Sequence, residues 1–521
     1  MRKLSKTDYI LSRECLKNVW VKWNLPAVYG QHEVSEFEQS LGVLGNEVEE
    51  LARGMFPDGY LVERRSEGAQ ALTQKLVAAE TPVIFQAVFA TDRFLAATDV
   101  LKWNESSGAY DLYEIKMSST EDEGEDGKKR VNRKKETQFE YDLTFQYNVL
   151  TLCGIKIHKK YLVRLNKEYV RQGELDFSRL FILEDKTGVV DILAEQALAE
   201  MNSTYEYLMQ TKEPEGYCLC YHKGRSAHCT TFSHTNPDVP AYSVHDLHKI
   251  GNSKSLLIEL LNEGVLHIKD VPLDDRLDPK KPAKGKKPSP PRKRNQVQVH
   301  KSQTPLIDYE SIARELNSLT YPLYFLDYET SPAPVPPYNG YRPYQQIVFQ
   351  YSLHVVRSPD AELEHYEELI LDGDPAPRIA ASLKKHIGPV GSVVVWFKTF
   401  ENTRNRELAS IVPQYQDFFH DLVARTYDLM DIVDQQHYVH PDFHGKASIK
   451  KVLPVLVPHM SYGDLAIQNG TGAIEAYRKV TKGEVVGVEL EELKKDMLMY
   501  CGQDTLAMVH IWQEFRKSIV K

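Results

Sequence analysis

The stretch Arg93–Lys116, RFLAATDVLKWNESSGAYDLYEIK, predicts how the first half of the chain is arranged. Two runs of strand-forming residues flank a polar Asn-Glu-Ser-Ser-Gly turn, which is typical of a β-hairpin. Residues two apart in a strand share a face, so Glu114 and Lys116 should lie side by side, with Asp99 reaching them from the neighbouring strand. Carboxylates bind Mg²⁺ or Mn²⁺, and an ammonium can orient or help deprotonate a water that attacks a phosphodiester. The segment therefore predicts a phosphodiesterase site; an exposed hairpin with an ordinary salt bridge is the plainer interpretation.

Helices predicted on either side of this hairpin carry side chains that would complete the site. The segment 35–57 is expected to be helical and supplies Glu47, which we assign as a third metal ligand, with Glu49 as the alternative. The segment 137–154 is expected to be a helix that ends at a Gly cap and places Gln146 within reach of the metal.

Four of the six cysteines bracket this predicted core, and they are Cys15, Cys218, Cys220 and Cys229. Six cysteines in so long a chain do not indicate a disulfide framework, and clustered cysteines in a reducing compartment are better interpreted as metal ligands. Cys15 is expected on a helix near the amino terminus. Four thiolates, or thiolates together with His222 and His228, could bind Zn²⁺. The same four thiolates could hold an iron-sulfur cluster.

Acids also stand at strand ends in the second half of the chain. In FLDYET, Asp327 and Glu329 are two residues apart and point the same way, as a pair of metal ions would require. WFKTFE places Glu401 just after another strand, at an expected helix start. In YCGQD, Tyr500 lies one helical turn before Asp504, so the phenol and the carboxylate share a face. Together the three motifs predict a second site for divalent cations.

The order of Asp99 and then Glu114-Ile-Lys116 resembles the PD-(D/E)xK nucleases. With the helical Gln146 it is similar to the RecB-type nuclease domain, including the nucleases of CRISPR adaptation, although the usual tyrosine four residues after the glutamine is absent. The resemblance implies that Lys116 and Gln146 are catalytic and that Glu47, Asp99 and Glu114 bind Mg²⁺ or Mn²⁺.

One cysteine before that core and three after it is the distribution of the iron-sulfur relatives of the same family. The resemblance therefore implies that the four cysteines hold a [4Fe-4S] cluster, with Zn²⁺ as the alternative that their spacing alone favours.

The motifs of the second half resemble the three exonuclease motifs of the DnaQ-like DEDD family, which has a ribonuclease H fold, in its tyrosine-bearing form. The resemblance implies that Tyr500 orients the attacking water and that the metal ligands are Asp327, Glu329, Glu401 and Asp504. The second motif normally offers Asp rather than Glu. Asp428 is the nearby alternative, although its position better matches a structural residue.

Segments spread over the whole chain, among them KTDYILSRECLKNVW, YPLYFLDYET and YCGQDTLAMV, resemble an uncharacterised bacterial family that joins a RecB-like nuclease to a DnaQ-like domain. The expected fold class is α/β, with an N-terminal restriction-endonuclease-like domain and a C-terminal ribonuclease H-like domain. The expected segments are 1–235 for the first domain, 236–278 for a helical connection, 279–303 for a basic disordered linker, and 304–521 for the second domain.

The net charge and the apolar content of the chain limit which partners it can have. The net charge of −9 argues against a uniformly basic coat protein and confines any nucleic-acid contact to a local surface. The amino terminus lacks the apolar core of a signal peptide and no apolar run spans a membrane, so we expect a cytoplasmic protein. The leading hypothesis is a metal-dependent deoxyribonuclease with two sites, acting in DNA repair or defence against foreign DNA. A ribonuclease is the first alternative, and a nucleic-acid-binding assembly module with one decayed site is the second.

Overall fold

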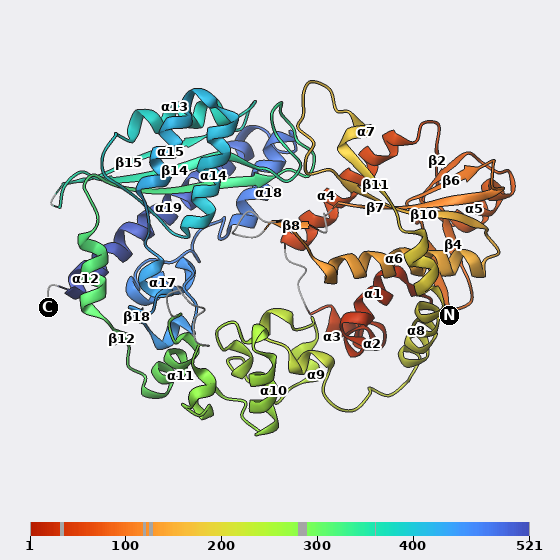
Figure 1. The fold of residues 1–521 in the computed structure, drawn as a ribbon, viewed down its shortest axis with the longest axis horizontal. Helices are drawn as coiled ribbons and strands as arrows, with labels where there is room; N and C mark the ends of the chain where they lie inside the picture. Colours follow the sequence, from red (N-terminus) through yellow and green to blue (C-terminus); the bar gives the residue numbers. More distant parts are fainter. Residues whose placement is uncertain are drawn as a thin grey trace. The chain divides into compact units, whose positions relative to one another are not determined.

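The computed structural model describes residues 2–31, 36–117, 121–123, 129–279, 289–359 and 361–519. The chain forms two compact units, coloured from red to yellow and from green to blue for most of their length in Figure 1. Unit 1 comprises Met1–Tyr221, His228–Pro237 and Pro334–Gln345, and unit 2 comprises His222–Ala227, Asp238–Ala333 and Gln346–Lys521. Each unit is α/β with its own sheet and its own hydrophobic core. The segment Pro334–Gln345, which we expected in the second domain, groups with unit 1.

A six-stranded sheet with the order β11-β10-β7-β6-β3-β2 forms the centre of unit 1. Its central strand β7 pairs antiparallel with β6 and parallel with β10. The strands are β2 (Tyr60–Leu61), β3 (Val83–Phe85), β6 (Val100–Asn104), β7 (Ala109–Lys116), β10 (Ile157–Leu165) and β11 (Phe181–Asp185). Seven of the eight residues of β7 are buried, so the strand that carries the Glu-x-Lys motif runs through the middle of the fold.

The hairpin expected from the sequence exists for β6 and β7 only. The first apolar run is divided between β5 (Phe94–Ala97) and β6, and β5 belongs to a separate three-stranded sheet with β1 (Leu4–Ser5) and β4 (Val88–Ala90). The chain therefore changes sheets around Asp99, at the edge where the predicted site lies.

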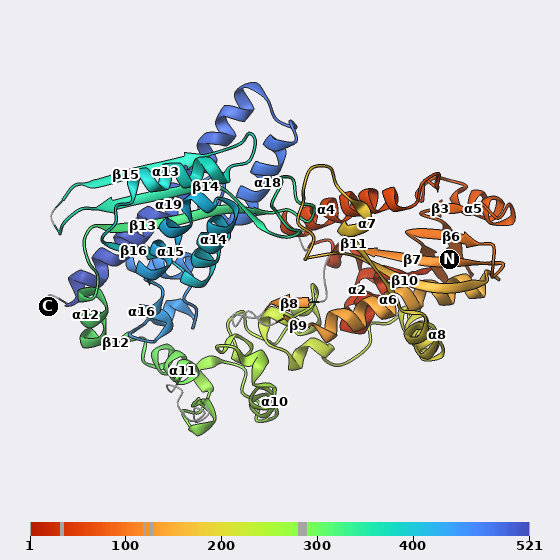
Figure 2. The same ribbon diagram turned by 45° about the horizontal axis from the view of Figure 1, so that its top comes forward.

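Helices cover both faces of the central sheet of unit 1. On one face, α6 (Arg133–Leu152) connects β7 to β10 and packs against α1 (Lys6–Glu14) and α8 (Thr187–Leu208), as Figures 1 and 2 show. Helix α2 (Leu16–Asn24) packs against α1 and α8. Gly154, at φ +81°, follows α6 and allows the chain to turn into β10. The other face packs against α4 (Glu36–Ala52), whose Val48 and Ala52 meet Tyr113 of β7.

One continuous helix was expected around Cys15, and the structure has two. The Ser5 side chain accepts a hydrogen bond from the backbone N–H of Asp8 and so caps α1, which ends at Glu14. Cys15 itself is extended, with φ −159° and ψ 100°, and α2 begins at Leu16. Cys15 therefore lies between two helices rather than on one.

A five-stranded sheet with the order β15-β14-β13-β16-β17 forms the centre of unit 2. Strand β13 pairs antiparallel with β14 and parallel with β16. The strands are β13 (Leu323–Pro332), β14 (Gln346–Val356), β15 (Leu363–Leu369), β16 (Ser392–Val395) and β17 (Thr426–Asp428). The long helix α19 (Gly487–Ile519) packs against β13 and β14, and α18 (Gly470–Thr481) also packs against β13. Helix α14 (Lys398–Ile411) follows β16 directly.

Part of the basic segment expected to be disordered is a helix. Residues 280–288 lie outside the described residues, but α11 spans Arg292–Ser302 and buries Val297 and Val299. Arg292 pairs with Asp434 at 2.6 Å, so this end of the segment is part of the packed structure of unit 2. The expectation of disorder failed here because the run of basic residues contains two valines that are buried when the segment packs as a helix.

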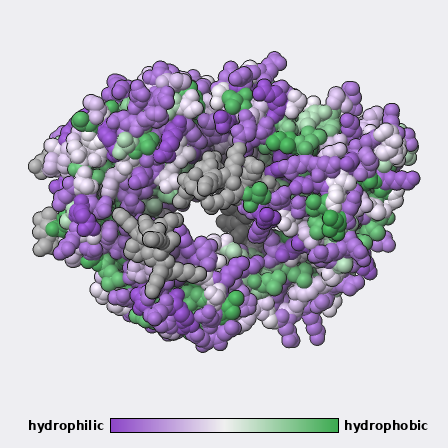
Figure 3. Space-filling model, viewed as in Figure 1, coloured by the Kyte–Doolittle hydropathy of each residue, from purple (hydrophilic) through white to green (hydrophobic). Residues whose placement is uncertain are grey.

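Polar residues predominate on the face of the molecule in Figure 3, with hydrophobic residues scattered among them. Among the described residues, no helix combines the length and the apolar character needed to cross a membrane.

Candidate functional site

Asp99 and Glu114 meet at the edge where β6 and β7 pair. Val100 pairs with Tyr113, so the preceding residue, Asp99, comes next to Glu114 in the antiparallel register. Asp99 accepts a hydrogen bond of 2.7 Å from the backbone N–H of Ile115, which fixes its carboxylate beside the following strand. Both acids are buried. The structure thus brings together the two predicted ligands on neighbouring strands.

Lys116 and Gln146 both contact Glu114. Lys116 Nζ donates to Glu114 Oε1 at 2.7 Å and also pairs with Asp142 of α6. Gln146 Nε2, one helical turn after Asp142, donates to Glu114 Oε2 at 2.6 Å. The Oε1 atom of Gln146 is buried and accepts no hydrogen bond. Helix α6 therefore delivers an amide oxygen and a carboxylate to the predicted site.

A second ammonium, which sequence reasoning missed, lies in the same place. Lys6, the first residue of α1, donates to Glu114 Oε1 at 2.6 Å and lies 3.5 Å from Asp142 Oδ1. Its position more than a hundred residues before Glu114 gave no local signal. The docking of α1 against α6 is what brings it in.

The acid that α4 contributes is Glu49. Its charge raises the pKa of Asp99, and its Oε1 accepts hydrogen bonds from Gln86 and Arg53, both at 2.8 Å. Glu47 is half-buried and two residues earlier on the helix, and residues two apart on a helix face in different directions. The alternative assignment, Glu49, therefore fits the geometry better than Glu47.

The charges of this first site are strongly coupled. Burial favours the neutral amine of Lys116, but Asp142 and Glu114 outweigh burial and raise its pKa. Burial similarly opposes ionisation of Glu114, and the two lysines outweigh it and lower the pKa of this carboxyl. Burial and the charge of Glu114 raise the pKa of Asp99. With a raised pKa, Lys116 stays protonated and is suited to orient a water or stabilise negative charge rather than to remove a proton.

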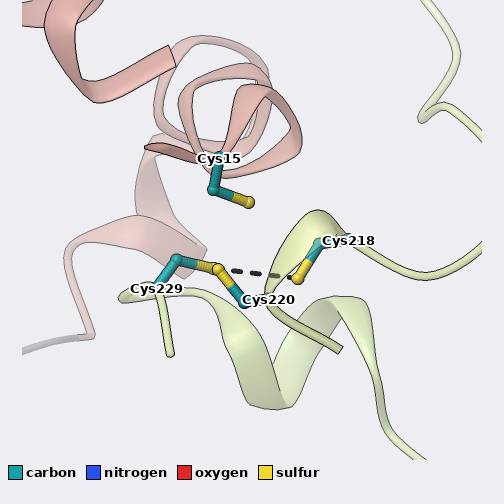
Figure 4. A group of neighbouring side chains, drawn as sticks. All are labelled: Cys15, Cys218, Cys220 and Cys229. Carbon is teal, nitrogen blue, oxygen red and sulfur yellow. Dashed lines mark hydrogen bonds between the residues drawn. The ribbon is translucent and has the colours of Figure 1, made fainter. Parts of the chain in front are cut away.

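The four predicted cysteines converge in unit 1 (Figure 4). Their Sγ atoms all lie within 4.8 Å of one another, and Cys218 Sγ and Cys229 Sγ are 3.9 Å apart. Cys15 comes from the break between α1 and α2, and the other three come from the segment after α8, with their side chains pointing toward a common centre in Figure 4. Hydrogen bonds from the neighbouring thiols hold the pKa of Cys218 well below its usual range. Four thiols at this spacing are a donor set for a metal ion or cluster.

The second group of acids lies around β13 in unit 2, where Asp327 and Glu329 stand inside the strand rather than at its expected end. A cavity of about 330 Å³ is lined by residues from β13, α14, α18 and α19, among them Asp327, Glu329, Glu401, Tyr500 and Asp504. Burial and the neighbouring acids raise the pKa values of Asp327, Glu329 and Glu401 well above their usual range. The structure therefore brings together every residue predicted for this site.

Glu401 is positioned by a strained turn between β16 and α14. Phe397 has φ +78°, and its backbone N–H donates to Asp428 Oδ1 at 3.0 Å, while the N–H of Lys398 donates to Asp428 Oδ2 at 2.7 Å. Asp428 thus holds the start of α14, and Glu401 lies in the first turn of that helix. Glu401 is 2% exposed and its Oε2 has no hydrogen-bond partner. A buried carboxylate oxygen without a donor is the feature expected of a residue that awaits a cation.

Tyr462, Tyr500 and Lys450 influence the pKa of Asp504. Burial raises its pKa to about 6, while the Tyr462 and Tyr500 hydroxyls and the charge of Lys450 pull it down. Tyr462 donates to Asp504 Oδ1 at 2.5 Å. Lys450 Nζ lies 5.3 Å from the ring centre of Tyr462 and 5.4 Å from that of Tyr500. Sequence reasoning missed Lys450 and Tyr462, which lie on segments that carry none of the three motifs.

Cys501 also lies at this site, although the sequence suggested only a buried apolar residue. Its Sγ is within 4.8 Å of carboxylate oxygens of Asp327 and Glu329. Burial, followed by the nearby acids, raises the thiol pKa well above its usual range. A neutral thiol is a poor ligand for the hard cations that carboxylates select, so Cys501 packs beside the acids rather than joining them.

Residues 324–448 match a family described as a domain of unknown function, DUF2779. The match covers β13, β14, α14 and Asp428. An uncharacterised protein of Ureaplasma parvum is 29% identical over 155 residues, which is 26% of this chain and 22% of that protein. An uncharacterised protein of Mycoplasma genitalium is 27% identical over 213 residues, 37% of this chain and 32% of that protein. The chain therefore matches less than a third of the length of these bacterial relatives, and no solved structure matches it.

Proposed function

We propose that this protein is a metal-dependent nuclease that hydrolyses DNA phosphodiester bonds at two separate sites, one in each unit. The observation that carries the proposal is the group of four acids around the cavity of unit 2, where burial and neighbouring carboxylates raise the pKa values of Asp327, Glu329 and Glu401 and where Glu401 Oε2 has no donor. Such a group is unfavourable without a positive charge between its members. Divalent cations supply that charge and bind through carboxylate oxygens.

In unit 2 the residues Asp327, Glu329, Glu401 and Asp504 would hold the cations, which when bound activate water and stabilise the charge that develops on the phosphate. The Tyr500 hydroxyl lies at the cavity and is suited to orient the attacking water. Tyr462 fixes one oxygen of Asp504 and so aims the other. Lys450, near both phenols, adds a positive charge that favours the anionic substrate.

In unit 1 the residues Asp99, Glu114 and Glu49 would hold Mg²⁺ or Mn²⁺. The Oε1 of Gln146, which is buried and accepts no hydrogen bond, is a further oxygen ligand that α6 can supply. Lys116, held by Glu114 and Asp142, would orient the water and stabilise the negative charge of the transition state. The separate carboxylate sets in separate units support two independent activities, with end trimming in unit 2 and strand cleavage in unit 1.

The four cysteines would form a thiolate centre that fastens the start of unit 1 to the segment after α8. The resemblance to iron-sulfur nucleases favours a [4Fe-4S] cluster. The sulfur spacing favours a single Zn²⁺, because Zn–S bonds of about 2.3 Å in a tetrahedron place the sulfurs about 3.8 Å apart, whereas a four-iron cluster binds each thiolate at a different corner. Broad absorption near about 400 nm would identify the cluster, and colourless protein with stoichiometric zinc would identify the single ion.

DNA is the favoured substrate because the resemblance is to DNA nucleases of repair and defence. A ribonuclease remains the second candidate, since DEDD-type sites cleave either polymer and the described site residues include no evident reader of a 2′-hydroxyl.

The test is hydrolysis of labelled single-stranded DNA, duplex DNA and RNA, with Mg²⁺, with Mn²⁺ and with neither. The proposal predicts metal-dependent cleavage of DNA by the wild type. Asp327→Ala with Glu329→Ala should abolish end trimming, and Lys116→Ala should slow the other activity by about a hundredfold. Cleavage that needs no divalent cation, or that survives unchanged in all variants, would contradict the proposal. Preferential cleavage of RNA would select the second candidate.

A further inference from the structure

Helices α1 and α6 line an open cavity of about 330 Å³ that none of the motifs predicts. Its lining is Ile10, Arg13, Glu14, Arg133, Lys134, Thr137 and Gln138. All seven residues belong to unit 1, and three of them are cationic. The single acid in the lining is Glu14.

The helical register connects this cavity to the first site. Ile10 lies one turn after Lys6 on α1, and Gln138 lies one turn before Asp142 on α6. Lys6 and Asp142 in turn lie 3.5 Å apart at the site itself. The cavity therefore lies one helical turn from the first site, along the seam between the two helices.

The cations of this cavity differ in how they are held. The Arg13 guanidinium lies 3.2 Å from the ring centre of Tyr141 and pairs with Glu200, so its position is fixed. Lys134 has a side chain that is 85% exposed, and its pair with Glu14 spans 3.4 Å. Exposed pairs of this kind contribute little to stability, so a phosphate can replace Glu14 as the partner of Lys134.

The start of α6 adds to the attraction for an anion. The helix has 20 residues and begins at Arg133, so the positive end of its dipole lies beside the two exposed cations. Cations, a cavity and the start of a helix therefore occur at one place, next to acids suited to phosphodiester hydrolysis. All of these features favour a ligand that carries phosphates.

We propose that the cavity between α1 and α6 binds the backbone of a single nucleic-acid strand and leads it to Asp99, Glu114 and Lys116. The assignment rests on the proposed nuclease function of unit 1. An open cavity of about 330 Å³ between two contacting helices accepts part of one strand but not a base-paired duplex, whose two backbones lie on opposite sides of the pairs. Arg133 and Lys134 contact phosphates, and Lys6 marks the inner end of the path.

The test is the affinity of the full-length protein for a fluorescein-labelled oligo(dT) strand, measured by anisotropy with Ca²⁺ in place of Mg²⁺ and with a gel to confirm that the strand stays intact. Arg133→Gln with Lys134→Gln removes the two exposed cations. Lys75→Gln with Lys102→Gln is the control, because it removes the same charge from exposed positions of unit 1 outside the cavity.

Each phosphate contact to a single strand contributes about 0.7 to the slope of log affinity against log salt. The double variant should therefore lower the slope by about 1.4. Its loss of affinity relative to the wild type should be about 25-fold greater at 0.1 M salt than at 1 M salt. The control should keep the slope of the wild type. In cleavage assays the double variant should raise KM and leave kcat unchanged, since it removes binding and not chemistry.

An unchanged slope and affinity in the double variant would overturn the proposal. An equal or larger loss with a duplex probe would also overturn it, because the cations would then serve duplex binding. If the wild type cleaves no nucleic acid at all, the proposed function fails, while the binding comparison still decides whether this cavity takes a single strand.

Discussion

Asp504→Asn should stabilise the metal-free protein while abolishing metal-dependent activity of unit 2. Burial raises the pKa of Asp504 from 3.8 to about 6 in the folded protein. Each pKa unit corresponds to about 1.4 kcal/mol, so keeping this carboxylate ionised costs the metal-free fold about 3 kcal/mol at neutral pH. Asparagine removes that cost and still offers an oxygen to the hydroxyl of Tyr462.

The sign of the effect follows from the raised pKa. Below pH 3.8 the carboxyl is protonated in both the folded and the unfolded chain, so the penalty is absent. The penalty grows as the pH rises from 3.8 to about 6 and is constant above that value. The advantage of the variant should therefore be small near pH 4 and complete at pH 7.5.

Differential scanning calorimetry in metal-free buffer measures the effect. For a unit of this size, about 3 kcal/mol corresponds to an increase in Tm of roughly 6–12 °C at pH 7.5. Added Mn²⁺ should raise the Tm of the wild type and leave that of the variant nearly unchanged. Asp464→Asn, at an exposed position of unit 2, is the matched control. It should change neither the Tm of the metal-free protein nor the increase in Tm that Mn²⁺ causes. A Tm for Asp504→Asn at or below that of the wild type at pH 7.5 would refute the electrostatic argument.

Two further predictions concern unit 1. Lys6→Met should strengthen Mn²⁺ binding at the first site by about tenfold, because a cation must otherwise displace the ammonium that bonds Glu114 at 2.6 Å. Titration calorimetry measures the affinity, and weaker binding by the variant would show that Lys6 supports the metal instead. Cys15→Ala should reduce the metal content of the thiolate centre and lower the Tm of unit 1, since Cys15 is the one ligand of the four that comes from the junction of α1 and α2. Elemental analysis and absorption spectra measure the loss. Full metal content in the variant would remove Cys15 from the ligand set.

The acids that pair along strands could be predicted from the sequence. Asp327 and Glu329 share a face because the period of a strand is two, and Tyr500 meets Asp504 because one helical turn separates them. The four cysteines could also be assigned together, although Cys15 lies between two helices rather than on one.

The residues that were missed depend on tertiary packing. Lys6 reaches Glu114 only because α1 docks on α6, and Lys450 reaches the rings of Tyr462 and Tyr500 from a helix with no motif of its own, α17 (Ile449–Leu456). Glu49 fits the geometry better than Glu47 for a related reason: the face of α4 that meets the sheet is set by Val48 and Ala52, which the local acidic pattern does not reveal.

The central claim is that two sites act independently, and cleavage of a circular single-stranded DNA tests it most directly, because a circle offers no end to trim. With Mg²⁺ or Mn²⁺, the wild type and the Asp327→Ala, Glu329→Ala double variant should open the circle at equal rates. Lys116→Ala should open it about a hundredfold more slowly and still trim linear strands at the rate of the wild type. Circles that stay intact with every protein, or that are opened normally by Lys116→Ala but not by the double variant, would contradict the account.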